Sequence, residues 1–362
     1  MVTYNKHVHI EDAPSPVREG LDRAIRQAVE RDERILAVLE DMGFPALLWL
    51  RDNYPDRIIE CGIAEQNGAV VAAGLAAEGY IPIINNFFFA GVARAYNQIR
   101  QSILVDRFNV KFIGREGAWG EPGISHNTIE GIGSARVMPN LVILNPSDAV
   151  EMEKAAEAML QYVGPVLLRQ ESSPPSIKIF SDDLPFTIGR AFSLREGKDA
   201  TIIATGYMLT EAIRALDLLE RDGLDVGLLD MCTLKPLDDE AIVAAAERTG
   251  AIVTAENGTV IGGLGDGVAA VLAENRPTPM VRVGIDDENL ILDLDREADL
   301  GQCRGRLPQV RLTDQLTAAP QLKNREAIGQ HPFEVTVAEH RHFVLQADEA
   351  PAQEQRRHPG VA

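Results

Sequence analysis

Short apolar runs alternate with helix-forming stretches along the first 170 residues of this 362-residue chain, and this alternation constrains the fold most strongly. Buried strands that alternate with helices pair in parallel and are covered by those helices on both faces. We therefore expect an α/β fold. The predicted strands are 35–41, 57–62, 80–85, 109–114, 140–146 and 164–170, and the first of them, ILAVLED, ends in an acid. The predicted helices are 15–33, the stretch that ends near 79, 90–104 and 147–161.

The pattern loosens near residue 190 and then starts again. Strands are predicted at 200–206, 225–231 and 251–257, with helices at 208–223 and after 262–267. The interpretation is two doubly wound domains, 1–190 and a smaller α/β domain at 191–325. Residues 326–362 form a polar tail whose composition is typical of disorder.

The charge balance excludes some classes of partner. The formal net charge is −19, from 54 acidic and 35 basic residues. Because phosphate-bearing surfaces attract positive charge, we expect neither a nucleic-acid nor a membrane partner. The chain has no run of about 18 apolar residues and no signal-like start. The three cysteines Cys61, Cys232 and Cys303 show no metal or disulfide spacing, which favours a cytoplasmic location.

Helix starts and histidines give weaker signals. Ser15 and Ser147 are predicted as N-caps, with Pro16 in the first turn of the first helix. His126 lies in the glycine-rich loop 114–127, where it is either a surface histidine or part of a ligand site. The other six histidines are in the terminal segments: His7, His9, His331, His340, His342 and His358. No acid or cysteine accompanies them at metal-ligand spacing, so no metal site is predicted.

One acidic residue has unexpected surroundings. Residues 58–79 read IIECGIAEQNGAVVAAGLAAEG, in which Glu65 is placed among small and apolar residues with no basic residue nearby. A buried carboxylate without a partner costs several kcal/mol or takes up a proton. The following segment 85–91, NNFFFAG, places Phe87 and Phe89 on one side of a strand. These rings are either core or a flat platform for a bound ring.

The glycine-rich segment GGLGDG at 262–267 has two interpretations, a phosphate-binding loop or a helix start packed tightly against its sheet. A lone glycine motif is a weak signal, and this one leads directly into a helix. We therefore predict the helix start.

The order of the stretches resembles the second half of transketolase, and most of all the C-terminal subunit of split bacterial transketolases. The resemblance rests on GIAEQNGAVVAAGLAAEGYIPIINNF, GEPGISHNTIEGIGSARVMPNLVILNPSDAVE and GPVLLRQ, and it covers about residues 15–285. It implies a pyrimidine-binding domain for thiamine diphosphate, followed by a transketolase C-terminal domain. It also implies transfer of a two-carbon ketol unit from a ketose or ketose phosphate to an aldehyde.

The resemblance also implies site residues. Glu65 would be hydrogen-bonded to a ring nitrogen of the aminopyrimidine, and an apolar setting helps such a carboxyl to share a proton at neutral pH. Phe87 would stack on the pyrimidine, with Phe89 beside it. His126 would contact the ketol oxygens of the substrate, and Arg169 would hold its distal anion.

The sequence departs from the family pattern in two places. Pro122 and Ser125 replace the usual aspartate and threonine of the loop, and Arg115 and Glu116 lie near the place of an earlier histidine. The segment 40–57 lacks the small polar stretch that usually helps to bind donor and acceptor. A specialised ketol or acyl transfer is therefore as well supported as pentose-phosphate chemistry. A Gly-Asp-Gly and Asn-Asn signature for magnesium and diphosphate is incomplete, because Glu288 precedes Asn289.

The resemblance therefore implies a separately encoded N-terminal subunit that provides most of the ligands of the Mg²⁺ ion. The two kinds of subunit would form a heterotetramer. Two alternatives remain open at this stage. One is the beta subunit of a 2-oxo-acid decarboxylating dehydrogenase, and the other is a non-catalytic scaffold half.

Overall fold

The computed structural model describes residues 3–41, 43, 45–118, 126, 128–171, 173 and 175–287. For Phe87, Phe89 and Ala90 it describes the backbone only. The end of the second predicted domain, the predicted tail 326–362, Cys303, Asn289 and the four C-terminal histidines lie outside the described residues.

The first sheet has seven strands in the order β12-β6-β7-β5-β4-β2-β3. All neighbours pair in parallel except β12, which is antiparallel to β6. Its parallel strands are β2 Ile35–Leu39, β3 Ile58–Glu60, β4 Ile81–Phe87, β5 Lys111–Glu116, β6 Val142–Leu144 and β7 Val166–Glu171. Every residue of β2 and of β6 is buried, as expected for strands covered on both faces.

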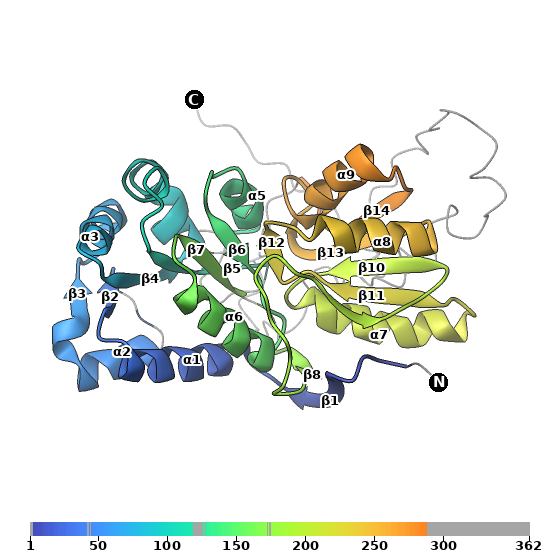
Figure 1. The fold of residues 1–362 in the computed structure, drawn as a ribbon, viewed down its shortest axis with the longest axis horizontal. Helices are drawn as coiled ribbons and strands as arrows, with labels where there is room; N and C mark the ends of the chain where they lie inside the picture. The colour runs from blue at the N-terminus through green and yellow to red at the C-terminus, as the bar shows by residue number, and fades with distance from the viewer. Residues whose placement is uncertain are drawn as a thin grey trace, which may run out of the picture.

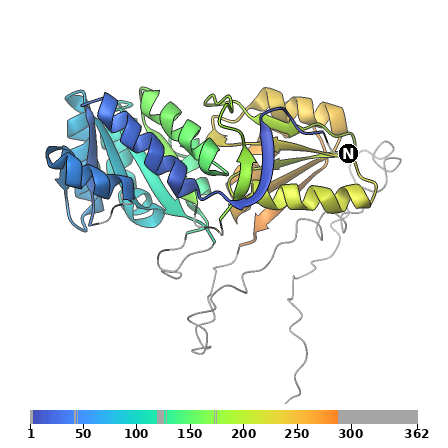
Figure 2. The same ribbon diagram turned by 90° about the horizontal axis from the view of Figure 1, so that it is seen from below.

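Helices cover both faces of this sheet (Figure 1). One face carries α1 Val17–Arg31, α2 Pro45–Asn53 and α6 Ala149–Gln161, whose apolar residues share one core cluster. Figure 2 shows α1 and α6 side by side along the molecule. The other face carries α3 Glu65–Ala77, the helical segment Phe89–Leu104 and α5 Gly131–Arg136. The predicted doubly wound α/β fold is confirmed.

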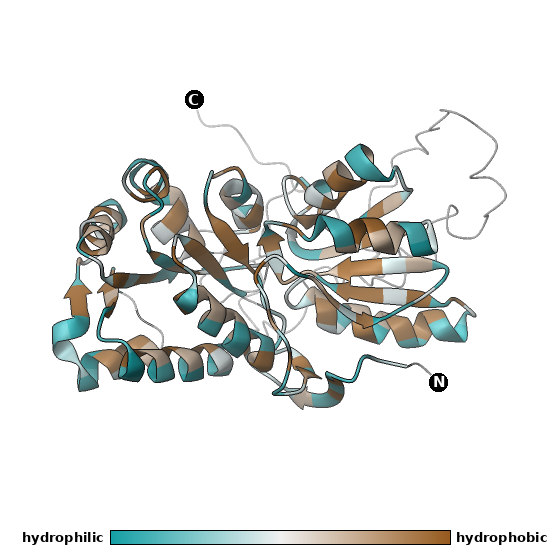
Figure 3. Cartoon of the chain, viewed as in Figure 1, coloured by the Kyte–Doolittle hydropathy of each residue, from teal (hydrophilic) through white to brown (hydrophobic). Residues whose placement is uncertain are grey.

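The second sheet has five strands in the order β14-β13-β10-β11-β9. They are β9 Phe192–Arg195, β10 Ala200–Ala204, β11 Val226–Asp230, β13 Ile252–Thr259 and β14 Met280–Ile285. Helix α7 Met208–Arg221 covers one face, and α8 Asp239–Thr249 with α9 Leu264–Asn275 covers the other. Figure 3 shows apolar strands between helices with polar outer surfaces.

The two sheets are tied together by strands and by a shared core. The short strand β12, Thr233–Lys235, follows β11 in the chain but pairs with β6 of the first sheet. The backbone N–H of Asn145 donates to the Cys232 carbonyl at 2.7 Å. One apolar cluster continues from α3 and the segment 89–104 to α8 and α9. A separate antiparallel pair joins β1 Val8–Pro14 to β8 Ile177–Phe180.

Both predicted serine caps are wrong in detail. The Ser15 hydroxyl accepts a hydrogen bond from the backbone N–H of Ala149 at 3.1 Å, so it binds the start of α6, and α1 has no side-chain cap. Asp148 is the N-cap of α6 and accepts from the N–H of Glu151 at 2.8 Å. Ser147 instead donates its N–H and its hydroxyl to the Glu151 carboxylate.

The segment 262–267 is a helix start packed against its sheet, as predicted. Leu264 and Gly265 donate their backbone N–H groups to the Glu256 carboxylate at 2.7 and 2.9 Å. Burial raises the pKa of Glu256 to about 7. A side chain at Gly265 would clash with Arg282 and Thr254.

Among the residues that the structure describes, none of the helices has the length and apolar character needed to cross a membrane. Cys61 and Cys232 are both free thiols.

Candidate active site

Polar side chains gather at the carboxyl edge of the first sheet. Leu39 at the end of β2 lies opposite both Glu60 of β3 and Asn85 of β4, so these strands end at the same level. The residues that follow, Glu40 and the start of α3, are therefore brought to one edge. Ligands of open α/β sheets bind at this edge.

The turn between β3 and α3 fixes where the helix begins. Gly62 has a φ of +66°, a left-handed conformation that side chains disfavour. The Glu60 carboxylate accepts from the N–H of Gly62 at 2.9 Å and from the N–H of Asp41 at 3.0 Å. This turn allows α3 to begin at Glu65 directly above the ends of the strands.

Glu65 is buried in the first turn of α3, with 4% of its surface exposed. Its Oε1 atom accepts a hydrogen bond from Nη1 of Arg94 at 2.5 Å. Arg94 ends the π-helical turn η2, Phe89–Arg94, and its side chain is partly exposed. The expectation that this acid has no partner within the chain is therefore wrong, because the fold brings in a cation from 29 residues away.

Glu40 is a second buried carboxyl beside the first, with 2% of its surface exposed. Its Oε2 atom accepts from the Asn86 side chain at 2.7 Å, and its Oε1 atom has no hydrogen-bond partner in the described part of the chain. Burial raises the pKa of Glu40 to about 7; the Asn86 hydrogen bond opposes this shift, and the charges of Glu65 and Glu60 add to it. The sequence carried one signal for this residue, a buried strand ending in an acid.

For three predicted site residues, Phe87, Phe89 and His126, the structure describes only part of the side chain or of its surroundings. Phe87 ends β4 and Phe89 begins η2, so their backbones lie at the same sheet edge. Their side chains are outside the description, and their stacking role stays a prediction. His126 is half-buried, but the neighbouring loop residues are not described, so its role also stays a prediction.

Arg169 lies on β7, with 2% of its surface exposed. Its Nε atom donates to Glu116 at 2.5 Å, Nη2 donates to the Asn257 carbonyl at 2.6 Å, and Nη1 lies 3.4 Å from Glu171. Burial raises the pKa of Glu116 and of Glu171, while the charge of Arg169 opposes that effect. All three guanidinium nitrogens thus have internal partners in a network that joins the two sheets. An anion-binding role for Arg169 stays a prediction.

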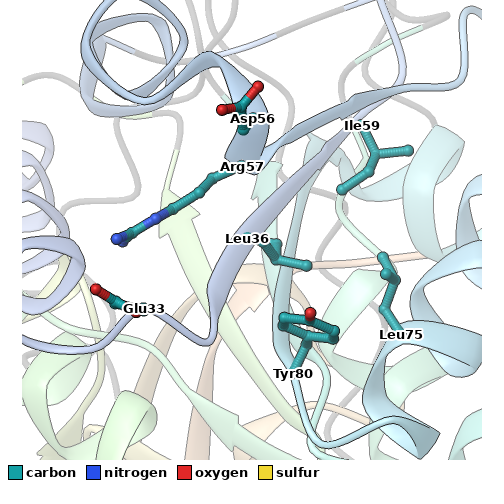
Figure 4. A pocket seen from close by; sticks show the side chains of 7 residues that line it. All are labelled: Glu33, Leu36, Asp56, Arg57, Ile59, Leu75 and Tyr80. Carbon is teal, nitrogen blue, oxygen red and sulfur yellow. The ribbon is translucent and has the colours of Figure 1, made fainter.

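A cavity of about 380 Å³ lies at the other end of the strands (Figure 4). Its walls come from the starts of β2 and β3, the end of α3 and the turn before β4: Glu33, Leu36, Asp56, Arg57, Ile59, Leu75 and Tyr80. None of the predicted site residues lines it, so we do not assign it to the candidate site. Within the described ranges, no three His, Cys, Asp or Glu residues are grouped so that they could hold a metal ion.

Comparison with known proteins agrees with this architecture. Residues 14–173 match the family model "Transketolase, pyrimidine binding domain", and residues 189–292 match "Transketolase, C-terminal domain". A 6-deoxy-6-sulfo-D-fructose transketolase subunit from Clostridium sp. (strain MSTE9) is 38% identical over 266 residues, which is 71% of this chain and 81% of the relative. An apulose-4-phosphate transketolase subunit from Phocaeicola vulgatus is 34% identical, over 76% of this chain and 88% of the relative.

A solved structure described as "Split gene transketolase, inactive beta4 tetramer" is similar in both fold and sequence. It superposes with a TM-score of 0.71 and 37% identity, over 76% of this chain and 91% of the other. The matched domains, their order and the similarity to these relatives lead to one conclusion: this chain belongs to the transketolase family, of which it carries the pyrimidine-binding and C-terminal domains.

Proposed function

We propose that this chain is the C-terminal subunit of a thiamine-diphosphate-dependent transketolase-like enzyme. It would transfer a two-carbon ketol unit from a ketose or ketose phosphate donor to an aldehyde acceptor. The observation that carries the proposal is Glu65, a carboxyl buried at the ligand-binding edge of a parallel sheet. A buried acid at such an edge is a functional-site candidate on physical grounds.

The residues at the edge fit an aminopyrimidine ring. Glu65 follows the turn at Gly62 at the start of α3, so the edge offers a carboxyl acceptor for a ring N–H group. When bound, thiamine diphosphate supplies the carbon nucleophile that accepts the ketol unit. Glu65 would bind a ring nitrogen and share a proton with it, and Phe87, with Phe89 beside it, would stack on the ring.

Two further residues have proposed roles toward the substrate. His126 would contact the ketol oxygens and stabilise the charge that develops on them. Arg169 would hold the distal anion of the substrate, which requires that it exchange part of its contact with Glu116 or Glu171.

We also propose a partner subunit, which supplies the diphosphate and Mg²⁺ site. The relatives named above are subunits of transketolases, and the described residues contain no acidic cluster for a metal. The surface around α3 supports an assembly, because Ile63 and Val70 are 74% and 47% exposed. A helix that is apolar on its outer face as well is usually covered by another element or subunit. A heterotetramer in the cytoplasm is the proposed form.

The test is the exchange Glu65→Gln in the complex of this chain with its N-terminal partner. Because general acid–base groups contribute about 10²–10⁴-fold to rate, the variant should lose ketol transfer by a factor in that range. Glu78→Gln, at the exposed end of the same helix, is the matched control and should keep wild-type activity. Equal turnover by Glu65→Gln and wild type, with the cofactor bound in both, would overturn the catalytic assignment.

A further inference from the structure

We propose that Glu40 is a positioning residue of the cofactor site, which holds the proton that the Glu40–Glu65 carboxyl pair retains at neutral pH. The proposal rests on the proposed function, and it adds a residue that the resemblance does not supply. It starts from the geometry at the end of β2.

Glu40 sits in a cradle that only glycine permits. A Cβ atom added at Gly68 would lie 2.3 Å from Oε1 of Glu40, and one added at Gly91 would lie 3.7 Å from its Oε2 and 2.9 Å from the Asn86 Cβ. Asn86 clamps the same Oε2 atom at 2.7 Å. Helix α3 and η2 therefore close directly over the carboxyl group, which leaves Oε1 buried without a partner among the described residues.

This cradle places Glu40 next to Glu65. Gly68 follows Glu65 by three residues on α3, and residues three apart lie on the same face of a helix. The face that carries the Glu65 carboxyl is therefore the face against which Glu40 packs. No hydrogen bond joins the two carboxyls in the described structure, so they interact through their charges.

Within the described part of the chain, no cation pairs directly with Glu40. The groups that face it are Glu60 of β3, Glu65 of α3, Arg94 of η2 and the Cys61 thiol, besides Asn86. Arg94 is the cation among them, and it is bound to Glu65 at 2.5 Å. An ionised Glu40 would face two neighbouring carboxylates in a buried site, which favours its neutral form.

The two carboxyls therefore have different roles. Arg94 forms an ion pair with Glu65, whereas Glu40 Oε1 has no partner among the described residues, so we place the retained proton on Glu40 in the free chain. In the proposed mechanism, Glu65 shares a proton with a ring nitrogen near neutral pH. The protonated Glu40 beside it keeps one proton in this part of the site.

The first experiment uses the full chain alone. Melting temperatures of wild type, Glu40→Gln, Glu65→Gln and the double variant are measured from about pH 5 to about pH 9, with Glu78→Gln as control. A carboxyl with a raised pKa in the folded state makes the fold less stable as the pH rises through that value. Wild type should therefore lose stability with an inflection at about pH 7, the value of Glu40. Glu40→Gln should be flatter across this window, and Glu78→Gln should follow wild type.

The Glu65→Gln background tests the coupling. Removing the Glu65 charge and releasing Arg94 should both move the Glu40 inflection to lower pH. Glu256 also has a pKa of about 7, so the contribution of Glu40 is read as the difference between wild type and Glu40→Gln, and between Glu65→Gln and the double variant. An identical pH dependence in wild type and Glu40→Gln would overturn the proposal, and so would a difference curve with the same midpoint in both pairs. Carbon-13 titration of the side-chain carboxyls in wild type gives the same answer if Glu40→Gln does not fold.

The second experiment addresses the cofactor. Thiamine diphosphate with Mg²⁺ is titrated calorimetrically into the assembled complex, in buffers of different ionisation enthalpy, which counts the protons taken up or released on binding. In wild type, the number of protons taken up or released on cofactor binding should change around neutral pH. In Glu40→Gln this number should stay constant over the same range. If wild type binds no thiamine diphosphate, the proposed function fails together with the cofactor role of Glu40, while the stability result for the free chain still stands. If both bind with the same proton count at every pH, only the Glu40 proposal fails.

Discussion

At the scale of single residues, two glycines of α3 differ in the space around them: Gly68 is tightly packed and Gly74 faces open space. A Cβ at Gly68 would lie 2.3 Å from the buried carboxyl of Glu40, whereas Gly74 on the same helix has nothing within 4 Å. Gly68→Ala should lower the free energy of unfolding by about 1–3 kcal/mol, the usual range for overpacking. Gly74→Ala should raise it by about 0.5–1 kcal/mol, because alanine favours the helix. Urea denaturation of the two variants checks both signs, and equal effects would contradict this description of the cradle.

Arg169 gives a second prediction at this scale. Removing one member of a buried ion pair leaves the other charge without compensation and costs about 3–5 kcal/mol. Arg169→Met should cause a loss of this size, because Glu116 and Glu171 would both remain buried. Denaturant unfolding measures it. A variant that is as stable as wild type but has a raised KM for a phosphorylated substrate would favour the anion-binding role instead.

The sequence predicted where Glu65 lies along the chain but not what it contacts. The motif around Glu65 placed that acid correctly at the head of a helix. The partners could not be predicted, because Arg94 lies 29 residues further on and Asn257 lies 88 residues from Arg169. Such contacts depend on which strand ends meet at one edge, and a linear pattern does not record this.

At the scale of elements, Asp148 serves two structures at once. One carboxylate oxygen caps α6 through the N–H of Glu151, and the other accepts from the N–H groups of Ile179 and Phe180 at 2.9 and 3.1 Å. Burial raises the pKa of Asp148 to about 6, against these three hydrogen bonds. The residue therefore fastens β8 to the start of the helix.

Asp148→Ala should lower the free energy of unfolding by about 3 kcal/mol or more. The loss combines a missing N-cap, about 1 kcal/mol, with two buried N–H groups that lose their acceptor. Asp182→Ala, at an exposed position of the following turn, is the matched control and should change stability little. Chemical denaturation compares them. A loss below about 1 kcal/mol would show that water replaces the carboxylate.

Most of the parallel strands were predictable from the sequence, and the antiparallel ones were not. The runs that became β2, β3, β4, β5, β6, β7, β10, β11 and β13 were all located, because a strand covered on both faces is almost continuously apolar. Strand β1 was missed because most of its residues are exposed, and β12 because it has three residues and is defined by its pairing with β6. The helix at 90–104 contains π-helical turns at both ends, η2 and η3 (Arg100–Leu104), which its periodicity did not indicate.

At the scale of the whole molecule, several buried carboxyls act on stability in the same direction. Burial raises the pKa of Glu40 and Glu256 to about 7 and that of Asp148 to about 6, and it raises the pKa of Asp230 well above its ordinary value. The folded chain therefore binds more protons than the unfolded chain between about pH 4 and about pH 7, so stability falls as the pH rises through that window.

Melting temperatures at constant ionic strength should accordingly be higher at about pH 5.5 than at about pH 7.5. Lys111 acts with the opposite sign only above this window, because burial lowers its pKa to about 7. Calorimetric scans across the range check the direction. A melting temperature that rises steadily from the lower to the higher pH would contradict the protonation of these groups in the folded state.

The pairing of β12 with β6 means that the halves of this protein cannot be cut apart cleanly between residues 173 and 189, where the two family matches separate. A fragment that ends there would lack β12, so β6 would become an unpaired edge strand. The Asn145 N–H would also lose its acceptor, the Cys232 carbonyl. Unprotected strands of this kind recruit other chains. Expressed by itself, the N-terminal fragment should self-associate, and adding back the missing C-terminal piece should dissolve those aggregates.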